Sequence, residues 1–213
     1  MTSSARPRSR RRLPAEQDEA AFTAALAASV EALEAQGIQH CVIGGLASAA
    51  VGRPRWTRDI DFLVRPGDAR RGLETLARAG FETEETDQTW LYKAWLKGVL
   101  VDVIFQVRGI YMDDEMAARA RPAQVLGVPF RAVSPEDLLV MKAIVHEEKT
   151  PRHWHDALAV LGAGSQIDWD YLVRRAKAGP RRVLSLLVYA QSNDLIVPDE
   201  PIRRLVDLVY AQG

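Results

Sequence analysis

Three aspartates in apolar segments are the residues of this sequence best suited to chemistry. Asp59 and Asp61 alternate with apolar residues in the segment DIDFLV, a pattern typical of a β-strand. Successive side chains of a strand point to opposite faces, so both carboxylates are expected on one face. Asp102 stands in VLVDVIF, where six of seven residues are apolar, as in a strand covered on both faces. The pattern predicts carboxylates held together on rigid elements.

Carboxylates held this close repel one another, so a cation between them is favoured. A divalent ion that prefers oxygen ligands fits, most simply Mg²⁺, which proteins bind through one or two carboxylates plus substrate phosphates. A lone Asp-x-Asp is more often a solvated edge or a helix cap, and Asp102 has the alternative of a structural ion pair with an arginine in the core. The agreement of three acids favours the metal site.

A Gly-Gly turn precedes these aspartates in the chain. Residues 41–43 form a short apolar run, Gly44 and Gly45 end it, and the alanine-rich segment over 46–51 is expected to be helical. Backbone N–H groups at a helix N-terminus bind phosphate when no side chain intervenes. We therefore predict a triphosphate cradle beside the metal site, with a plain turn as the alternative.

Basic residues near these motifs are candidates for phosphate contacts. Arg53, Arg55 and Arg58 occupy the loop before Asp59, and guanidinium groups pair bidentately with phosphate. Arg58 is taken as the nucleotide-binding candidate, although its side chain is expected on the face opposite Asp59. Charge balance for the aspartates is the alternative role of these arginines.

These motifs carry a family resemblance. The chain resembles the nucleotidyltransferase fold of DNA polymerase β, and within it the abortive-infection nucleotidyltransferase toxins of the AbiEii type and the MenT proteins, in Gly44-Gly45, Thr57-Arg58-Asp59-Ile60-Asp61 and Asp102. The resemblance covers residues 38–106, with a weaker continuation to 162. It implies that the glycines hold the phosphates of a nucleoside triphosphate (NTP). It also implies that the aspartates hold two Mg²⁺ ions, or Mn²⁺, and that Asp102 activates the acceptor hydroxyl.

The resemblance also implies roles further along the chain. Lys142 lies in a helix expected to begin at Ser134, with Ser134 as its N-cap, and matches a phosphate-binding lysine on the equivalent helix of the family. A lysine that extends to solvent is the alternative. Arg152 and Asp156 match a family segment that reads basic residue, then Lys-Asp, but His155 stands where lysine is usual. We take Thr57, Arg152 and Asp156 as supporting residues.

Composition bounds the class of protein. Of 213 residues, 47% are hydrophobic and 26% charged, as in a soluble globular protein, and no apolar run approaches the roughly 20 residues of a membrane span. A cytoplasmic protein is expected. The 28 basic and 28 acidic residues balance, so a whole-surface attraction for nucleic acid is not indicated. Trp90, Tyr92 and Trp95 are interpreted as core, with stacking on a base as the alternative.

The predicted organisation has three parts. Residues 1–14 form a disordered basic arm with five arginines, either a contact for RNA or a solubilising tail. Residues 15–134 form an α/β (α+β) nucleotidyltransferase core with a small mixed β-sheet flanked by helices. Residues 135–213 form a helical C-terminal region with clusters of arginine.

The predicted reaction is metal-dependent transfer of a nucleoside monophosphate (NMP) from an NTP to a hydroxyl. The acceptor is expected to be RNA, at the 3' end of tRNA, as in toxin–antitoxin or abortive-infection systems, where a cognate antitoxin would be the protein partner. Two alternatives stay open. One is a non-catalytic module that binds a nucleotide or a partner, as an antitoxin does. The other is a nucleotidyltransferase for a small molecule such as an antibiotic.

Overall fold

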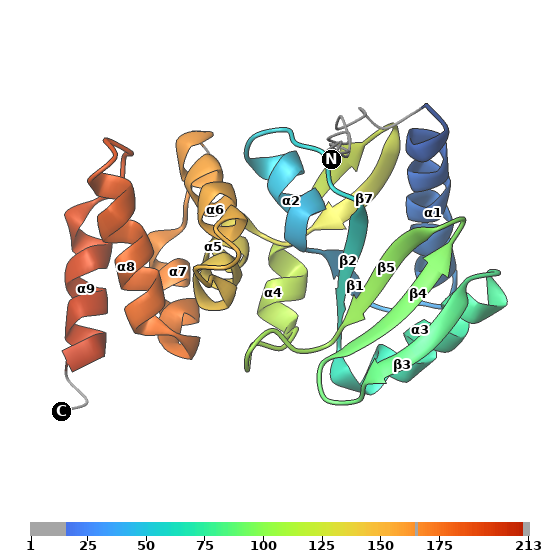
Figure 1. Ribbon diagram of the computed structural model, residues 1–213. Coiled ribbons are helices and arrows are strands. Elements are labelled where there is room, and N and C mark those ends of the chain that lie inside the picture. Colours follow the sequence, from blue (N-terminus) through green and yellow to red (C-terminus); the bar gives the residue numbers. More distant parts are fainter. Residues whose placement is uncertain (1–15, 165, 211–213) are drawn as a thin grey trace, which may run out of the picture.

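The computed structural model describes residues 16–164 and 166–210. Its strands are β1 (His40–Val42), β2 (Asp59–Val64), β3 (Glu82–Asp87), β4 (Leu91–Leu96), β5 (Val99–Ile104), β6 (Arg121–Val125) and β7 (Val128–Ala132). They form one seven-stranded mixed sheet in the order β3-β4-β5-β2-β1-β7-β6 (Figure 1). The predicted basic arm over 1–14 lies outside the described residues.

β2 and β5 lie side by side at the centre of the sheet and run parallel. Their register places Asp61 directly opposite Asp102, so the two carboxylates leave neighbouring strands on the same face. β1 pairs with β2 on its other side, antiparallel, and leads into Gly44. The sheet thus brings the three predicted motifs together.

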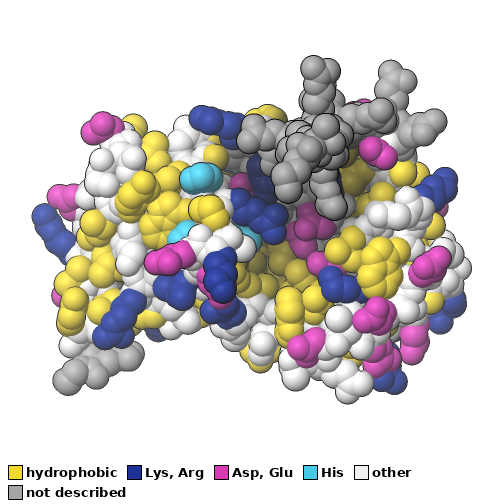
Figure 2. Space-filling view, viewed as in Figure 1, with side chains coloured by type: hydrophobic (Ala, Val, Ile, Leu, Met, Phe, Trp, Pro, Cys, Tyr) yellow, Lys and Arg dark blue, Asp and Glu magenta, His cyan; other side chains and the backbone are white. Residues whose placement is uncertain are grey.

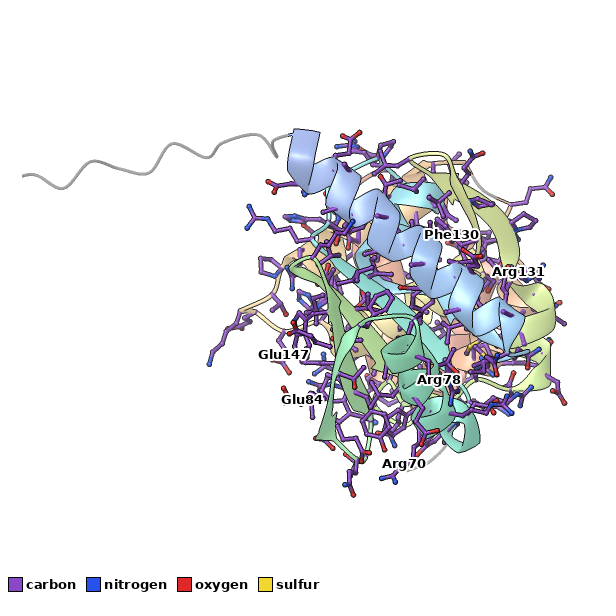
Figure 3. The ribbon with its side chains drawn as sticks, turned by 90° about the vertical axis from the view of Figure 1, so that its right-hand side faces the viewer. Arg70, Arg78, Glu84, Phe130, Arg131 and Glu147 are labelled. Atoms are coloured by element: carbon purple, nitrogen blue, oxygen red, sulfur yellow. The ribbon has the colours of Figure 1, made fainter. Side chains whose placement is uncertain are left out.

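Helices cover both faces of this sheet. They are α1 (Glu16–Ala35), α2 (Gly44–Val51), α3 (Ala69–Arg78), which follows the 3₁₀ turn η1 (Pro66–Asp68), and α4 (Asp114–Arg119). α1 and α3 pack together on one face, with α1 lying across the strands (Figure 3). Phe22, Leu26 and Leu33 of α1 are buried, and each such side chain contributes about 1.5–3 kcal/mol on burial. The opposite face, which carries the aspartates, is covered by α2.

The chain then continues in helices only. They are α5 (Pro135–Val145), α6 (Arg152–Gly162), α7 (Trp169–Arg175), the 3₁₀ turn η2 (Ala176–Ala178), α8 (Pro180–Gln191) and α9 (Asp199–Tyr210). They stand beside the sheet, with α5 and α6 nearest to α2 and α8 and α9 farthest from it (Figure 1). None of the described helices is long and apolar enough to cross a membrane.

The predicted fold class is confirmed, namely a mixed sheet flanked by helices with a helical C-terminal part. The division at residue 134 stays a prediction, and α5 begins directly after it. The hairpin of β6 and β7 starts at Arg121, because β6 pairs along the whole of β7. The interpretation of Trp90 as core is wrong, since its side chain is 40% exposed.

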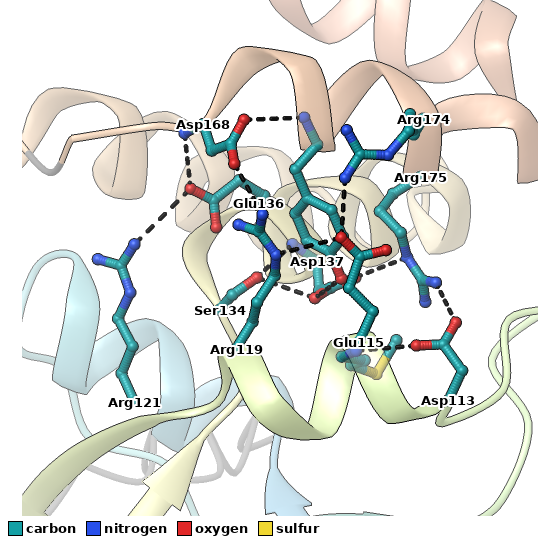
Figure 4. A network of polar contacts seen from close by, with 12 residues as sticks. Asp113, Glu115, Arg119, Arg121, Ser134, Glu136, Asp137, Asp168, Arg174 and Arg175 are labelled. Atoms are coloured by element: carbon teal, nitrogen blue, oxygen red, sulfur yellow. Dashed lines mark hydrogen bonds and ion pairs between the residues drawn. The ribbon is translucent and has the colours of Figure 1, made fainter.

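A polar network joins the start of α5 to α4 and α7 (Figure 4). At its centre the Asp137 carboxylate is buried and accepts hydrogen bonds from Tyr171 Oη at 2.8 Å and Ser134 Oγ at 2.9 Å. Arg175 Nε lies 2.9 Å from its other oxygen. The Ser134 hydroxyl also accepts from the backbone N–H of Asp137 at 3.1 Å, which confirms the predicted N-cap.

The same network also includes an arginine stacked on the Tyr171 ring and a second buried acid. The Arg119 guanidinium lies 3.9 Å above the centre of the Tyr171 ring, and Arg119 also donates to Asp168. The buried Glu136 carboxylate accepts from the backbone N–H of Asp168 at 2.9 Å. A buried carboxylate is costly unless it is paired, so these contacts fix how the helices stand against the sheet.

Tyr171→Phe tests this junction, because it keeps the buried ring and removes one donor to a buried carboxylate. We expect the free energy of unfolding to fall by about 1.5–3 kcal/mol, the usual value for a hydrogen bond to a charged group. Urea denaturation followed by circular dichroism measures it. Tyr210→Phe, at a tyrosine that is 71% exposed, is the control and should change little. Equal stability of both variants would contradict the assignment.

Candidate active site

A cavity of about 620 Å³ lies between the aspartate-bearing face of the sheet and helices α5 and α6. Acidic and basic side chains meet near the centre of this face of the molecule (Figure 2). The polar residues that line the cavity are Gly44, Gly45, Arg55, Thr57, Asp59, Asp61, Trp90, Asp102, Gln106, Arg108, Lys142, Arg152 and His153. Most of the residues predicted from separate segments therefore meet at one site.

Each outer aspartate is held by a neighbour. Thr57 Oγ1 donates to Asp59 Oδ1 at 2.5 Å, and Lys93 Nζ donates to Asp102 Oδ1 at 2.9 Å. Lys93 reaches Asp102 because β4 and β5 pair antiparallel with these two residues opposite each other. The core arginine considered as a partner for Asp102 is thus replaced by a lysine on the adjacent strand.

The electrostatics of the three carboxylates favour a cation. Burial, together with the charges of Asp59 and Asp102, raises the pKa of Asp61 to about 7 from an ordinary value of 3.8. Burial also raises the pKa of Asp102, against the opposing effect of Lys93. Among the described residues no three acids or histidines already converge on a common point, because Thr57 and Lys93 hold the outer two. The donor set fits Mg²⁺, provided that Asp102 exchanges its lysine for the ion.

The Gly-Gly turn fits closely against this cluster. Gly44 has a φ of +65°, and a Cβ atom there would lie 1.8 Å from Asp61 Oδ2. A Cβ on Gly45 would lie 2.6 Å from Thr57 Oγ1, and the Gly45 backbone N–H donates to the Asp61 carboxylate. Any side chain at either position would displace an aspartate or its support. The glycines therefore bring the N-terminus of α2 against the carboxylates.

A cationic pair stands beside the glycines and shares one counter-ion. The Asp156 carboxylate of α6 accepts from Lys142 Nζ at 2.7 Å and from Arg55 Nε and Nη2 at 2.7 and 2.8 Å. Lys142 is only 4% exposed, and burial lowers its pKa although Asp156 opposes this. Burial alone would raise the pKa of Asp156, but the bonds from Arg55 and Lys142 outweigh it and lower that pKa. The alternative in which the Lys142 side chain extends to solvent is therefore wrong.

The sequence-predicted residues divide clearly by position. Asp156 does not line the cavity but lies behind Lys142 and Arg55. Arg58 is exposed and lies outside the cavity lining, as its strand alternation indicated, whereas Arg55 enters it.

Lys93 was not among the site residues predicted from the sequence. The positive φ angles of Lys97 and Gly98 mark a two-residue hairpin turn, and counting back from it pairs residue 93 with residue 102.

Residues 7–192 match the family described as uncharacterised nucleotidyltransferase. The chain belongs to this family. A comparison with curated proteins found no match. The match spans most of the chain and includes every residue of the candidate site, so the protein is a nucleotidyltransferase enzyme. The finer resemblance to AbiEii-type and MenT proteins stays a prediction.

Solved structures agree on the fold of this nucleotidyltransferase. The solution structure of the antibiotic-resistance factor ANT(2'')-Ia is 16% identical with a TM-score of 0.53, over 80% of this chain and 97% of that one. Its crystal structure with adenylyl-2''-tobramycin is 17% identical with a TM-score of 0.50, over 84% and 99%. The lincosamide antibiotic adenylyltransferase LnuA, with lincomycin bound, is 12% identical with a TM-score of 0.46, over 68% and 96%. At these identities the ANT(2'')-Ia structures establish the fold alone.

Asp61→Asn should stabilise the metal-free nucleotidyltransferase. A carboxyl whose pKa is raised to about 7 in the folded state binds its proton more tightly there than in the unfolded chain, so stability falls as pH rises from about 4 to 7. Asparagine keeps the shape and removes that loss. With EDTA at pH 8 we expect a melting temperature at least about 3 °C above wild type, and near equality at pH 4.

Differential scanning calorimetry at both pH values measures this effect. Asp18→Asn, at an exposed position of α1, is the matched control and should follow the wild type. A variant that melts at or below the wild-type temperature at pH 8 would show that the carboxylates do not repel.

Proposed function

We propose that this nucleotidyltransferase transfers an NMP from an NTP to a hydroxyl at the 3' end of an RNA, with tRNA as the expected acceptor. The observation that carries the proposal is the placement of Asp59, Asp61 and Asp102 on adjacent strands against the glycine N-terminus of α2. A carboxylate cluster and a phosphate cradle share one cavity, as metal-dependent transfer to a hydroxyl requires.

Asp59, Asp61 and Asp102 would hold two Mg²⁺ ions, with Mn²⁺ as the alternative. When bound, these ions supply charge that stabilises the attacking and leaving oxygens. Asp61 would be one of these ligands, because its carboxylate is close enough to Asp59 and Asp102 for both charges to raise its pKa. Thr57 supports the arrangement by holding Asp59.

The triphosphate would lie beside the carboxylates, along the wall of the cavity that the glycine turn forms. The backbone N–H groups that follow Gly44 and Gly45 bind phosphate oxygens, and the glycines allow the close approach. Arg55 and Lys142 present guanidinium and ammonium groups to the same region, and Arg152 contributes from the start of α6. Asp156 orients the first two, so the cations are in place before the nucleotide arrives.

Asp102 is positioned to accept the proton of the acceptor hydroxyl. The deprotonated oxygen forms a bond to the α-phosphorus, the bond from that phosphorus to the bridging oxygen of the β-phosphate breaks, and pyrophosphate leaves with the bond electrons. Lys93 must release Asp102 for this step, since it now occupies one carboxylate oxygen. Its ammonium then stays within reach of the growing negative charge.

The charge of the cavity favours an anionic acceptor. Its acids are the three metal-binding candidates, whereas Arg55, Arg108, Lys142 and Arg152 also line it. Burial in the first place, and then the positive charges of Lys142 and Arg152, lower the pKa of His153 to about 4. A small-molecule acceptor is the second candidate, since the similar ANT(2'')-Ia structure holds adenylyl-2''-tobramycin. Among the residues that the structure describes, the cavity lining offers a polycationic amino sugar no carboxylate beyond the metal-binding candidates, so RNA is preferred.

The cellular role that we propose rests on the resemblance to AbiEii-type and MenT proteins. Modification of tRNA 3' ends in the cytoplasm would block translation, as a toxin or abortive-infection protein does, and a cognate antitoxin protein would be its partner. Induced expression should then arrest growth. Normal growth despite full expression of active enzyme would contradict this cellular role but not the proposed nucleotide transfer.

Asp59→Ala should abolish transfer, by about 10³-fold or more, because it removes a metal ligand while the half-buried strand position tolerates a small residue. Wild type and variant are incubated with Mg²⁺, each α-³²P-labelled NTP in turn, and total cellular RNA, and the products are resolved on a denaturing gel. Asp18→Ala is the matched control. Label on a tRNA-sized band with wild type and control alone supports the proposal. Label that requires an added aminoglycoside supports the second candidate.

Arg55→Ala and Arg58→Ala separate the two arginines beside the first aspartates. Arg55 lines the cavity and pairs with Asp156, whereas Arg58 is exposed outside it. We expect Arg55→Ala to raise the KM for NTP by about tenfold or more, as for loss of a charge-assisted hydrogen bond, and Arg58→Ala to change it less than about twofold. Steady-state transfer assays measure both. The reverse order would restore Arg58 as the nucleotide contact.

A further inference from the structure

Trp90 is a large aromatic side chain that is both fixed and exposed in the cavity. It lies in the turn between β3 and β4, is 40% exposed and lines the cavity. Its Nε1 donates to Asp87 Oδ2 at 2.9 Å, and its carbonyl oxygen accepts from the backbone N–H of Phe105 at 3.0 Å. Asp87 is itself held by Thr89 through backbone and side chain. Because the indole is already immobilised, stacking a ligand on it costs little conformational entropy.

The sheet places this indole on the acceptor side of the site. The order β1-β2-β5-β4 puts the glycine turn beyond Asp61 on one side and β4 beyond Asp102 on the other. Lys93 pairs with Asp102 and Leu91 with Ile104, so Trp90 lies three residues beyond Lys93, next to Leu91. Three residues of a strand span roughly 10 Å, which leaves room for one nucleotide between the indole and Asp102. The phosphate cradle and Trp90 thus flank the carboxylates on opposite sides.

Arg108 supplies a cation to the same side of the cavity. It has a φ of +46° in a tight turn with Gly109, closed by paired hydrogen bonds between Val107 and Ile110. A left-handed conformation is costly for a residue other than glycine, and such strain tends to occur at functional sites. Its guanidinium pairs with the Glu147 carboxylate, which comes from the segment after α5. Both side chains are about half exposed, so the pair can open to an anion.

We propose that Trp90 and Arg108 form the subsite for the terminal nucleotide of the acceptor strand, an inference that rests on the RNA acceptor proposed above. The terminal base stacks on the indole of Trp90. The phosphate on the 5' side of that nucleotide pairs with Arg108 in place of Glu147, and the 3'-hydroxyl then lies at Asp102. Every base has a π-face, so this subsite selects a strand end without reading its sequence. An amino sugar offers no such face.

The test is the KM for tRNA in the labelling assay, with the KM for NTP measured in parallel. Trp90→Ala should raise the KM for tRNA by about 5- to 100-fold and leave the KM for NTP within about twofold, because stacking is lost and the phosphate cradle is distant. Trp90→Phe should restore most of the loss. Trp56→Ala is the matched control, at a tryptophan that is 39% exposed and absent from the cavity lining.

A salt titration tests the second residue. The logarithm of the tRNA dissociation constant is plotted against the logarithm of KCl concentration, with RNA binding followed by filter retention. Arg108→Ala should make the slope shallower by about 0.7, the value for one phosphate contact in a single strand. Glu147→Ala should tighten binding by up to about fivefold, because it frees Arg108. Arg70→Ala, at an ion-paired arginine of α3, is the control and should leave the slope unchanged.

These experiments distinguish failure of the proposed subsite from failure of the proposed function. Transfer of label to RNA by wild type, with an unchanged tRNA KM in Trp90→Ala and an unchanged slope in Arg108→Ala, would overturn the subsite and leave the proposed function standing. Failure of wild type to label any RNA would overturn the proposed acceptor, and the subsite with it.

Discussion

Mutual repulsion among Asp59, Asp61 and Asp102 is the constraint on which this structure depends. An unpaired buried carboxylate costs several kcal/mol, and here three gather on the covered face of one sheet. The fold tolerates them through specific support, namely Thr57 at Asp59, a glycine N–H at Asp61 and Lys93 at Asp102. The parallel pairing of β2 and β5 leaves no freedom to separate them, so the repulsion persists in the folded chain.

The helical part of the chain contains a second buried charge, which is positive. Lys142 is buried in α5, and a buried ammonium requires a counter-ion. Asp156 of α6 provides it and also binds Arg55, which belongs to the loop before β2. This one carboxylate therefore couples both helices to the sheet. The Asp137 network does the same from the other end of α5, so the cavity walls are fixed by two buried acids rather than by apolar packing alone.

Local patterns were sufficient to predict the strands, the Gly-Gly turn and the N-cap of α5, because each depends on residues within a few positions. The metal candidates also followed from alternation. Side-chain contacts between segments far apart in the chain could not be predicted from local patterns. Arg55 and Asp156 are 101 positions apart, and nothing local distinguishes Arg55 from the predicted nucleotide contact Arg58 except strand alternation, which directs Arg58 to the face opposite Asp59. Lys93 could have been predicted as the partner of Asp102 from the hairpin turn at Lys97-Gly98, but only after the register of that hairpin had been assigned.

The two sides of the cavity differ in how rigidly their cations are held, and this difference bears on how the enzyme treats its two substrates. Lys142 and Arg55 are locked by a buried carboxylate, so the NTP side is preorganised. On the other side, Lys93 and Arg108 pair with Asp102 and Glu147, partners that substrates and ions must replace. Under the proposed function, binding the metal ions requires exchange of the Lys93–Asp102 pair and binding the acceptor requires exchange of the Arg108–Glu147 pair, whereas the triphosphate meets cations that are already in place. An order in which the nucleotide and its metal ions bind first, freeing Asp102 before the acceptor hydroxyl arrives, follows from that asymmetry.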